Sequence, residues 1–545
     1  MKKFLNLILI AGICLTAASC SSSIVKRMQA EENVVSTCTP SPLIVKAGQV
    51  PAQLAVSFPK GYFAPKAIVE VTPVLVYEGG EAKGPVFTYQ GEKVKDNYKV
   101  VAKTGTEVRE KVSFSYIDAM KKSTLELRGK LIYNGKEYEL PTRKVAEGCI
   151  TTGIDAVAGL DYAYKADGYQ AIIAQSTEGQ IMYDVNSATV KNSELKSKSI
   201  KRMQEELEEL KNNERVTVTG TQIISYASPE GGQELNAKLS DNRAETAEKA
   251  WKKLDTGVDA SAPEIKSVGQ DWEGFREAVT KSDIQDKDLI LRVLSMYSDP
   301  AVRESEIKNI SQIFTELKKE VFPELRRARF ITNSEFKNYS DQELKELAKT
   351  SADKLTEPAL LHLATLSDNL DVKAAFYEAA IEKYDSQTGL YNLACTYLEE
   401  GQAGKAETCL ENIDNQNDAD VINALGVAKM LKGDIDGANA LFVKANNIAN
   451  QGTVDIVKGN YSEAVAKLEG TSSKNKGVAY LLAGDYASAK NELTGDDAQT
   501  EYYLAIIAAR EGKASQVKSH LNSAFEKDPA LREKAAKDIE FAKYL

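Results

Sequence analysis

Three patterns of apolar and polar residues follow one another along the chain. From Leu54 to Tyr77, β-branched and polar residues alternate and prolines stand at the segment edges, which predicts strands of a β-sandwich. Alternating runs also flank Asn134-Gly135, and this pair predicts a hairpin because both turn positions favour positive φ. Residues 179–333 then predict strand, helix, strand, helix, further helices and a last strand, and from about residue 340 the sequence is helical and self-similar.

These patterns divide the chain of 545 residues into several parts, as its length also suggests at about 100 to 200 residues per domain. The expected fold is a multidomain α+β protein with an N-terminal β-sandwich-like domain, a central α/β sandwich and a C-terminal α-solenoid. The sequence places the β-rich domain at residues 38–150, a linker at 151–178, the central domain with a helical insertion at 179–335, and helical repeats at 336–545.

Composition then narrows the classes of function. With 43% hydrophobic and 27% charged residues, the chain is typical of a globular protein. Its net charge of -10 and the lack of a basic-aromatic stripe argue against nucleic acid as a partner. The only histidines are His362 and His520, both in helical segments, so a histidine-based catalytic site or zinc site is not expected. We expect a binding protein that needs no metal or cofactor and is not an enzyme.

The N-terminal residues indicate export. A basic start precedes an apolar run over residues 4–15 that is too short to span a bilayer, so residues 1–19 are expected to be a signal peptide. The sequence Ala18-Ser19-Cys20 resembles a bacterial lipobox, which implies a lipid anchor at Cys20 and a tether over residues 20–37. Cleavage by an ordinary signal peptidase is the alternative. No acidic cluster follows Cys20, which favours the periplasmic face of the outer membrane over the cell surface.

Export also bears on the remaining cysteines, because an oxidising compartment permits disulfides. Cys38 and Cys149 bracket the β-rich domain, and a bridge between them would join its two ends. Two free thiols are the alternative. Cys395 and Cys409 fall on the two helices of one predicted repeat, where a bridge and two buried thiols are both open.

The central segment carries the motif that bears most on function. After a predicted strand, a turn rich in Pro and Gly leads into an amphipathic helix that contains Asn236, Leu239, Ser240, Arg243 and Ala244. Their types and spacing resemble the OmpA-like peptidoglycan-binding domain, whose helix motif is Asn-x-x-Leu-Ser-x-x-Arg-Ala. Residues 183–189 resemble the family's first strand and its exit, and residues 325–330 resemble its closing Arg-Arg strand.

The resemblance implies a site for the zwitterionic diaminopimelate unit of the peptidoglycan peptide stem. In the family, the helix arginine binds the ligand's carboxylate and an aspartate in the turn helps with the rest; the matching positions here are Arg243 and Ser228. Serine supplies no charge, so affinity should fall unless Glu230 reaches in, and Asn236 completes the expected site. The alternative for Arg243 is a surface salt bridge, for instance to Glu230, on a domain retained as a scaffold.

The helical part contains a repeat. Small, aromatic, glycine and large apolar positions recur over residues 394–410, 426–445 and 505–529, with shorter units between the last two. The pattern resembles tetratricopeptide repeats, whose paired helices stack into a solenoid with a concave surface. The resemblance implies an unidentified protein partner on that surface. The alternative is a spacer, or an array that packs on the other domains.

Together these features predict an outer-membrane lipoprotein that binds peptidoglycan non-covalently and links it to the membrane, while the repeats hold a partner protein. The alternative keeps this architecture and makes the protein a scaffold subunit of an outer-membrane export or biogenesis complex that does not bind the cell wall. An enzyme acting on envelope glycans is a further alternative. The carboxylates it would need, such as Glu205 and Glu206, belong to a charged run typical of a solvated helix face.

Overall fold

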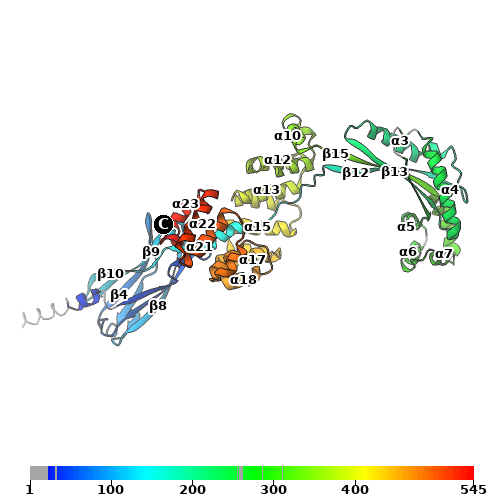
Figure 1. The fold of residues 1–545 in the computed structure, drawn as a ribbon. Helices are drawn as coiled ribbons and strands as arrows, with labels where there is room; N and C mark the ends of the chain where they lie inside the picture. Colours follow the sequence, from blue (N-terminus) through cyan, green and yellow to red (C-terminus); the bar gives the residue numbers. More distant parts are fainter. Residues whose placement is uncertain (1–22, 31–33, 255, 257–261, 285, 310) are drawn as a thin grey trace, which may run out of the picture. The chain divides into compact units, whose positions relative to one another are not determined.

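The computed structural model describes residues 23–30, 34–254, 256, 262–284, 286–309 and 311–545 (Figure 1). The predicted signal peptide and Cys20 therefore lie outside the described residues. The chain forms two compact units, one made of residues up to 166 together with 367–545, and the other of residues 167–366. The first unit contains N-terminal sheets and a C-terminal helical region, and the second is a mixed α/β unit.

Two sheets surround the core of the N-terminal part. One consists of β1 (Val35–Thr39), β3 (Gln49–Phe58) and β8 (Thr106–Ser115). The other has the order β10-β9-β4-β6-β7, with β5 paired to β4. Its strands are β4 (Ile68–Tyr77), β5 (Gly80–Lys83), β6 (Phe87–Gly91), β7 (Lys99–Val101), β9 (Ser123–Tyr133) and β10 (Lys136–Glu147). A short parallel pair, β2 (Leu43–Ile44) and β11 (Cys149–Ile150), adds a third, two-stranded sheet.

The alternating sequence pattern explains these strands. Every second residue of β9 is buried, which places Leu125, Leu127 and Leu131 in the core shared with β3 and β8. Asn134 and Gly135 connect β9 to β10 with φ angles of 52° and 71°. Both the strands and the hairpin expected from the sequence are thereby confirmed.

The second unit is built on a four-stranded sheet of order β12-β15-β13-β14. Its strands are β12 (Ile172–Met182), β13 (Val216–Ala227), β14 (Glu264–Gln270) and β15 (Arg327–Lys337); the pair β13–β14 is parallel and the other pairs are antiparallel. Helix α3 (Lys198–Lys211) follows β12, and α4 (Gln233–Trp251) follows β13. Ile200, Met203 and Leu207 of α3 are buried with Ile223 and Phe330 of the sheet, which confirms the apolar helix face expected there.

Five helices of the described chain separate β14 from β15, at the place of the expected helical insertion. They are α5 (Trp272–Lys281), α6 (Lys287–Met296), α7 (Pro300–Asn309), α8 (Ser311–Glu320) and α9 (Phe322–Leu325). Their facing sides bury a separate apolar core that includes Phe275, Ile290 and Phe322. Because these helices have a core of their own, the insertion does not interrupt the sheet pairing of β14 or β15.

Two further helices belong to the second unit, α10 (Asp341–Thr350) and α11 (Glu357–Thr365), although the sequence assigned them to the repeats. His362 of α11 lies with Nδ1 2.8 Å from Asp167 and Nε2 3.0 Å from Asp341, and its ring stacks on Tyr169. Burial alone would lower the pKa of His362, but the hydrogen bonds to the two carboxylates outweigh it and raise the pKa. This histidine therefore ties the first residues of the unit to its last helices.

The C-terminal region is a series of helix pairs, as the repeat in the sequence predicted. The first helices of the pairs are α13 (Gln387–Glu399), α15 (Ala419–Leu431), α17 (Ile448–Lys458), α19 (Asn475–Ala483) and α21 (Ala498–Arg510). Each packs against the helix that follows it: α14 (Ala403–Glu411), α16 (Ile435–Lys444), α18 (Tyr461–Leu468), α20 (Tyr486–Glu492) and α22 (Ala514–Lys527). Helix α12 (Leu370–Tyr384) precedes this series and α23 (Leu531–Lys537) follows it.

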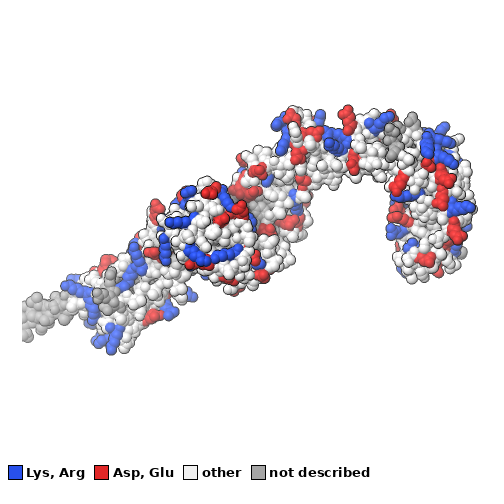
Figure 2. All heavy atoms as spheres, in the orientation of Figure 1, with Lys and Arg blue, Asp and Glu red and all other residues white. Residues whose placement is uncertain are grey.

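Glycine allows the paired helices to approach closely. A Cβ atom at Gly426 of α15 would lie 2.6 Å from the ring of Phe442 on α16. On the face drawn in Figure 2, basic and acidic side chains are interspersed over the described surface. None of the described helices combines the length and the apolar character needed to cross a membrane.

Candidate functional site

The four residues of the predicted site meet at one edge of the second sheet. Strands β13 and β14 are parallel, so their carboxyl ends lie at the same edge, where the antiparallel β15 begins. Ser228 and Glu230 follow β13, and Arg326 stands immediately before β15. Asn236 and Arg243 come to this edge from α4. The fold therefore brings together residues that are up to 15 positions apart in the motif and adds an arginine from the end of the insertion.

Arg243 is buried, with only 1% of its surface exposed. Its Nε donates to the carbonyl of Ser187 at 2.9 Å, and its two Nη atoms donate to the carbonyls of Tyr226 at 2.9 Å and Asp184 at 3.1 Å. Burial lowers the pKa of Arg243 to about 10. The guanidinium, which the resemblance assigned to a ligand carboxylate, thus binds the backbone of the chain itself, because three carbonyls from the exits of β12 and β13 converge on its planar donors.

Glu230 supplies the negative charge at the turn. Its Oε1 accepts a hydrogen bond from Ser228 Oγ at 2.8 Å and another from Arg326 Nε at 2.9 Å. Glu230 therefore stands beside the serine that occupies the position of the family's aspartate. The salt bridge of Glu230 is with Arg326, which corrects the surface pair with Arg243 considered from the sequence: α4 turns Arg243 inward, whereas Arg326 reaches Glu230 from the start of β15.

Asn236 holds the turn in place. Its Nδ2 donates to the carbonyls of Ser228 at 3.0 Å and Gly231 at 2.7 Å, and the side chain is buried. Both amide protons are therefore used within the chain. The residue fixes the turn to the first turn of α4, so any ligand that used Asn236 as a donor would have to displace the turn backbone.

A second ion pair at this edge was not foreseen. Asp271, directly after β14, accepts from the N–H of Gly274 at 2.9 Å and caps α5, while its other oxygen lies 2.9 Å from Arg327 Nη2. Burial raises the pKa of Asp271, and the charge of Arg327 opposes this effect. The signal in the sequence was the Arg326-Arg327 pair, but no chain pattern connects an arginine to an aspartate 56 residues earlier.

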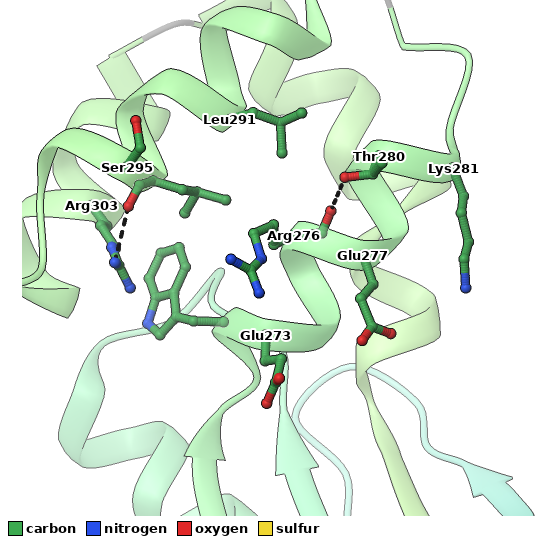
Figure 3. Close-up of a pocket in the computed structure, with 10 residues that line it drawn as sticks. Glu273, Arg276, Glu277, Thr280, Lys281, Leu291, Ser295 and Arg303 are labelled. Carbon is green, nitrogen blue, oxygen red and sulfur yellow. Dashed lines mark hydrogen bonds between the residues drawn. The ribbon is translucent and has the colours of Figure 1, made fainter. Parts of the chain in front are cut away.

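A cavity of about 920 Å³ opens in the insertion and is lined from α5, α6 and the start of α7 (Figure 3). Arg276 points into it, and Glu273, Glu277 and Lys281 stand around it. Arg303 donates to the carbonyls of Leu294 and Tyr297, so its cation is held at the wall. None of the residues predicted for the ligand site lines this cavity.

The repeats, expected to hold a partner protein on their concave surface, bind part of this chain. Residues 156–165, in cyan beside α15 and α17 in Figure 1, lie against the first helices of the pairs. They follow the short helix α2 (Thr152–Asp155) and begin with the 3-10 turn η3 (Ala156–Gly159). The first part of the expected linker, residues 151–178, is therefore bound in the repeats, and its last part is strand β12.

The four described cysteines are free. The predicted bridge between Cys38 and Cys149 is wrong in this structure, because Cys38 pairs with Leu54 across β1 and β3 whereas Cys149 pairs with Leu43 in the separate β2–β11 pair. Burial raises the pKa of each of these thiols to about 11. Cys395 and Cys409 are likewise unbridged. Within the described ranges, no group of three or more His, Cys, Asp or Glu side chains could hold a metal ion.

Comparison with known proteins concerns the helical repeats. No protein-family model and no curated protein matches the chain. The similar solved structures are tetratricopeptide repeat proteins: one from Parabacteroides merdae has 17% identity and a TM-score of 0.30, covering 34% of this chain and 85% of that one. A thermophilic repeat protein of Thermus thermophilus has 18% identity and a TM-score of 0.21, covering 34% of this chain and 99% of that one. The Cut9-Hcn1 hetero-tetramer of the APC/C has 14% identity and a TM-score of 0.22, covering 47% of this chain and 42% of that one. The likeness is one of fold alone.

Proposed function

We propose that the protein is a lipid-anchored scaffold of the outer membrane that acts by binding and not by catalysis, and that its OmpA-like unit does not hold the cell wall through Arg243. The observation that carries this proposal is the burial of Arg243, whose guanidinium donates to three carbonyls of the chain itself. A ligand carboxylate would have to replace these hydrogen bonds. It would also have to open the turn that Asn236 holds.

The OmpA-like resemblance of the unit is supported by the position of the motif in the fold. The turn with Ser228 and Glu230 joins β13 to α4, the helix that contains Asn236 and Arg243, and the closing arginines begin β15 at the same edge. In a scaffold, this arrangement is retained for stability. The surfaces of this unit and of the repeats then bind protein subunits of an outer-membrane export or biogenesis complex.

Sedimentation with purified peptidoglycan tests the proposal on residues 21–545, a chain that lacks Cys20 and therefore the proposed lipid. We expect this chain, the wild type of the assay, to remain in solution. Ser228→Asp, which restores the charge of the family's turn aspartate, should also remain in solution, because Arg243 stays bound to backbone carbonyls. Sedimentation of the wild type that is reversed by free diaminopimelate would refute the scaffold proposal.

A second function, non-covalent binding of the peptidoglycan peptide stem, is favoured by the pair Glu230–Arg326. Its side chains keep 19% and 10% of their surface exposed and present one anion and one cation at the sheet edge. A zwitterion such as diaminopimelate could exchange its ammonium and carboxylate with this pair. In that case Glu230→Gln and Arg326→Gln would each abolish sedimentation. The variants Glu178→Gln and Arg329→Gln, which alter another ion pair of the same sheet, would not.

The membrane attachment is proposed from the lipobox-like sequence that ends in Cys20. Cells fed labelled palmitate should label the wild type, which should fractionate with the outer membrane. Cys20→Ala should lose the label and appear in the soluble fraction. Retention of the variant in the membrane would indicate that another part of the chain or a partner provides the attachment.

A further inference from the structure

Four asparagines, one from each of four successive first helices, hold the bound segment of residues 156–165. Asn392 is on α13, Asn423 on α15, Asn450 on α17 and Asn475 on α19. All four are buried. A buried amide without a partner is costly, so each position requires hydrogen-bond partners in the groove. Here the backbone of the segment supplies them.

The asparagines bind the peptide backbone. Asn450 accepts from the N–H of Asp161 at 2.7 Å and donates to the carbonyl of the same residue at 2.8 Å. Asn392 makes the same pair of bonds with Lys165, at 2.8 Å and 3.0 Å. Each amide therefore pairs with one residue of the segment through both of its backbone groups. Every non-proline residue carries these groups, so the asparagines recognise extended chain as such.

The remaining two asparagines extend the same contact toward the start of the segment. Asn423 donates to the carbonyl of Asp161 at 2.8 Å. Asn475 donates to the carbonyl of Ala156 at 2.9 Å and to that of Gly159 at 3.2 Å. Ala156 and Gly159 belong to the turn η3, so Asn475 holds this turn, whereas the other three asparagines hold the chain beyond it at Asp161 and Lys165.

Two adjacent side chains of the segment add selectivity. The hydroxyl of Tyr164 donates to Glu399 at 2.7 Å, and the ammonium of Lys373 lies 4.7 Å from the centre of its ring. The ammonium of Lys165 lies 2.6 Å from Asp418. The groove therefore has a place for an aromatic residue followed by a basic one.

One side of the segment is open to solvent. Hollows of about 410 Å³ and 600 Å³ adjoin residues 158–163, and Ala158, Asp161 and Ala163 are exposed. Ala156 and Leu160 are instead buried among apolar side chains of the repeats. A competing peptide can therefore approach the groove beside the segment before it displaces the buried contacts.

We propose that residues 156–165 are a built-in ligand of a peptide-binding groove, and that the repeats accept a partner only in exchange for this segment. The partner is an extended peptide with an aromatic-basic pair. Because the segment is tethered to the groove, its effective concentration is about millimolar, and a free peptide at micromolar concentration competes poorly. This inference does not depend on whether the other unit binds the cell wall.

The test uses the full chain and a fluorescent peptide with the sequence of residues 151–166. Fluorescence anisotropy should show no binding to the wild type at micromolar concentration. The double variant Asp161→Pro/Lys165→Pro removes the two backbone N–H donors from the tethered segment, so the labelled peptide should bind at least tenfold more tightly. The matched control, Asp161→Ala/Lys165→Ala, keeps both backbone donors. Its affinity for the labelled peptide should be at least tenfold weaker than that of the proline variant.

Two additional measurements keep the outcome decisive. Adding Asn450→Ala to the proline variant should weaken peptide binding about tenfold or more, since two hydrogen bonds are lost. Circular dichroism should show that the proline variant keeps its helices. Helices lost in that variant would mean that the segment is a permanent part of the core and would overturn the proposal. Equal peptide binding by the wild type and the proline variant, or none by either, would overturn it as well.

Discussion

Arg243 offers the sharpest test of how the second unit is held together. In the variant Arg243→Met, the aliphatic stem is largely kept and the guanidinium is removed. The carbonyls of Ser187, Tyr226 and Asp184 then lose the donor that now satisfies them. Because the site is buried, water does not readily replace those bonds.

The expected loss follows from two opposing terms. A hydrogen bond to a charged group contributes about 2 kcal/mol, so three such bonds contribute about 6 kcal/mol. Burial lowers the pKa of Arg243 from 12.5 to about 10, which corresponds to a desolvation cost of about 3 kcal/mol that the variant no longer bears. The free energy of unfolding of this unit should therefore fall by about 3 kcal/mol.

Tryptophan fluorescence reports on the unfolding of this unit alone. The chain has two tryptophans, Trp251 on α4 and Trp272 on α5, and both lie within residues 167–366. Urea unfolding followed by their emission should show a clearly lower midpoint for Arg243→Met. The control is Arg202→Met on α3, which removes an exposed arginine paired with Glu206 and should change stability by less than about 1 kcal/mol. Equal midpoints for Arg243→Met and wild type would refute the role assigned to this arginine.

Three further predictions concern other parts of the chain. The pKa of His362 is raised above its ordinary value of 6.5, so its stabilising contribution is complete at low pH and is lost as pH rises through the raised pKa. The urea midpoint followed by tryptophan emission should therefore fall as pH rises above 6.5 in the wild type, and it should fall less in His362→Gln. Gly426→Ala should destabilise the repeats by about 1 to 3 kcal/mol by urea unfolding at 222 nm, because the new methyl group meets an aromatic ring at 2.6 Å, whereas Gly404→Ala, with open space around it, should not. Cys38 and Cys149 should react with a thiol reagent slowly in the folded protein and rapidly after unfolding, because both thiols are buried and free. Treatment with a reductant beforehand should not change either rate. A bridge between them detected by mass spectrometry would contradict this prediction.

Local patterns predicted what local physics decides. The turn at Asn134-Gly135 follows from the φ angles those two residues tolerate, and the buried face of α3 follows from its helical spacing. The motif around Arg243 also indicated correctly which residues of turn and helix come together. It did not indicate that the guanidinium would turn inward, because the three carbonyls that bind it are set by the exits of two strands and not by the motif.

The sequence could not predict the ion pairs between distant residues for the same reason. Glu230 and Arg326 are 96 positions apart, and many carboxylates of the chain could equally have been the partner of either arginine at the start of β15. Only the strand order β12-β15-β13-β14 brings the end of the helical insertion next to the turn after β13. The motif was enough to locate the site, but the ion pairs of the site could be identified only from the strand order of the sheet.

The sequence did not predict that the repeats bind the segment of residues 156–165. Residues 156–165 have the composition of a connection between domains, and their partners lie up to 319 positions later. A signal was nevertheless present, because a buried asparagine recurs in the first helix of four successive pairs. Asn392 and Asn423 lie within α13 and α15, whereas Asn450 lies in the first turn of α17 and Asn475 is the first residue of α19. Asparagine is a poor choice for the interior of a helix unless its amide has partners. Its recurrence at the inner face of a repeat array therefore predicts a backbone ligand, even where the sequence does not reveal that the ligand is the chain itself.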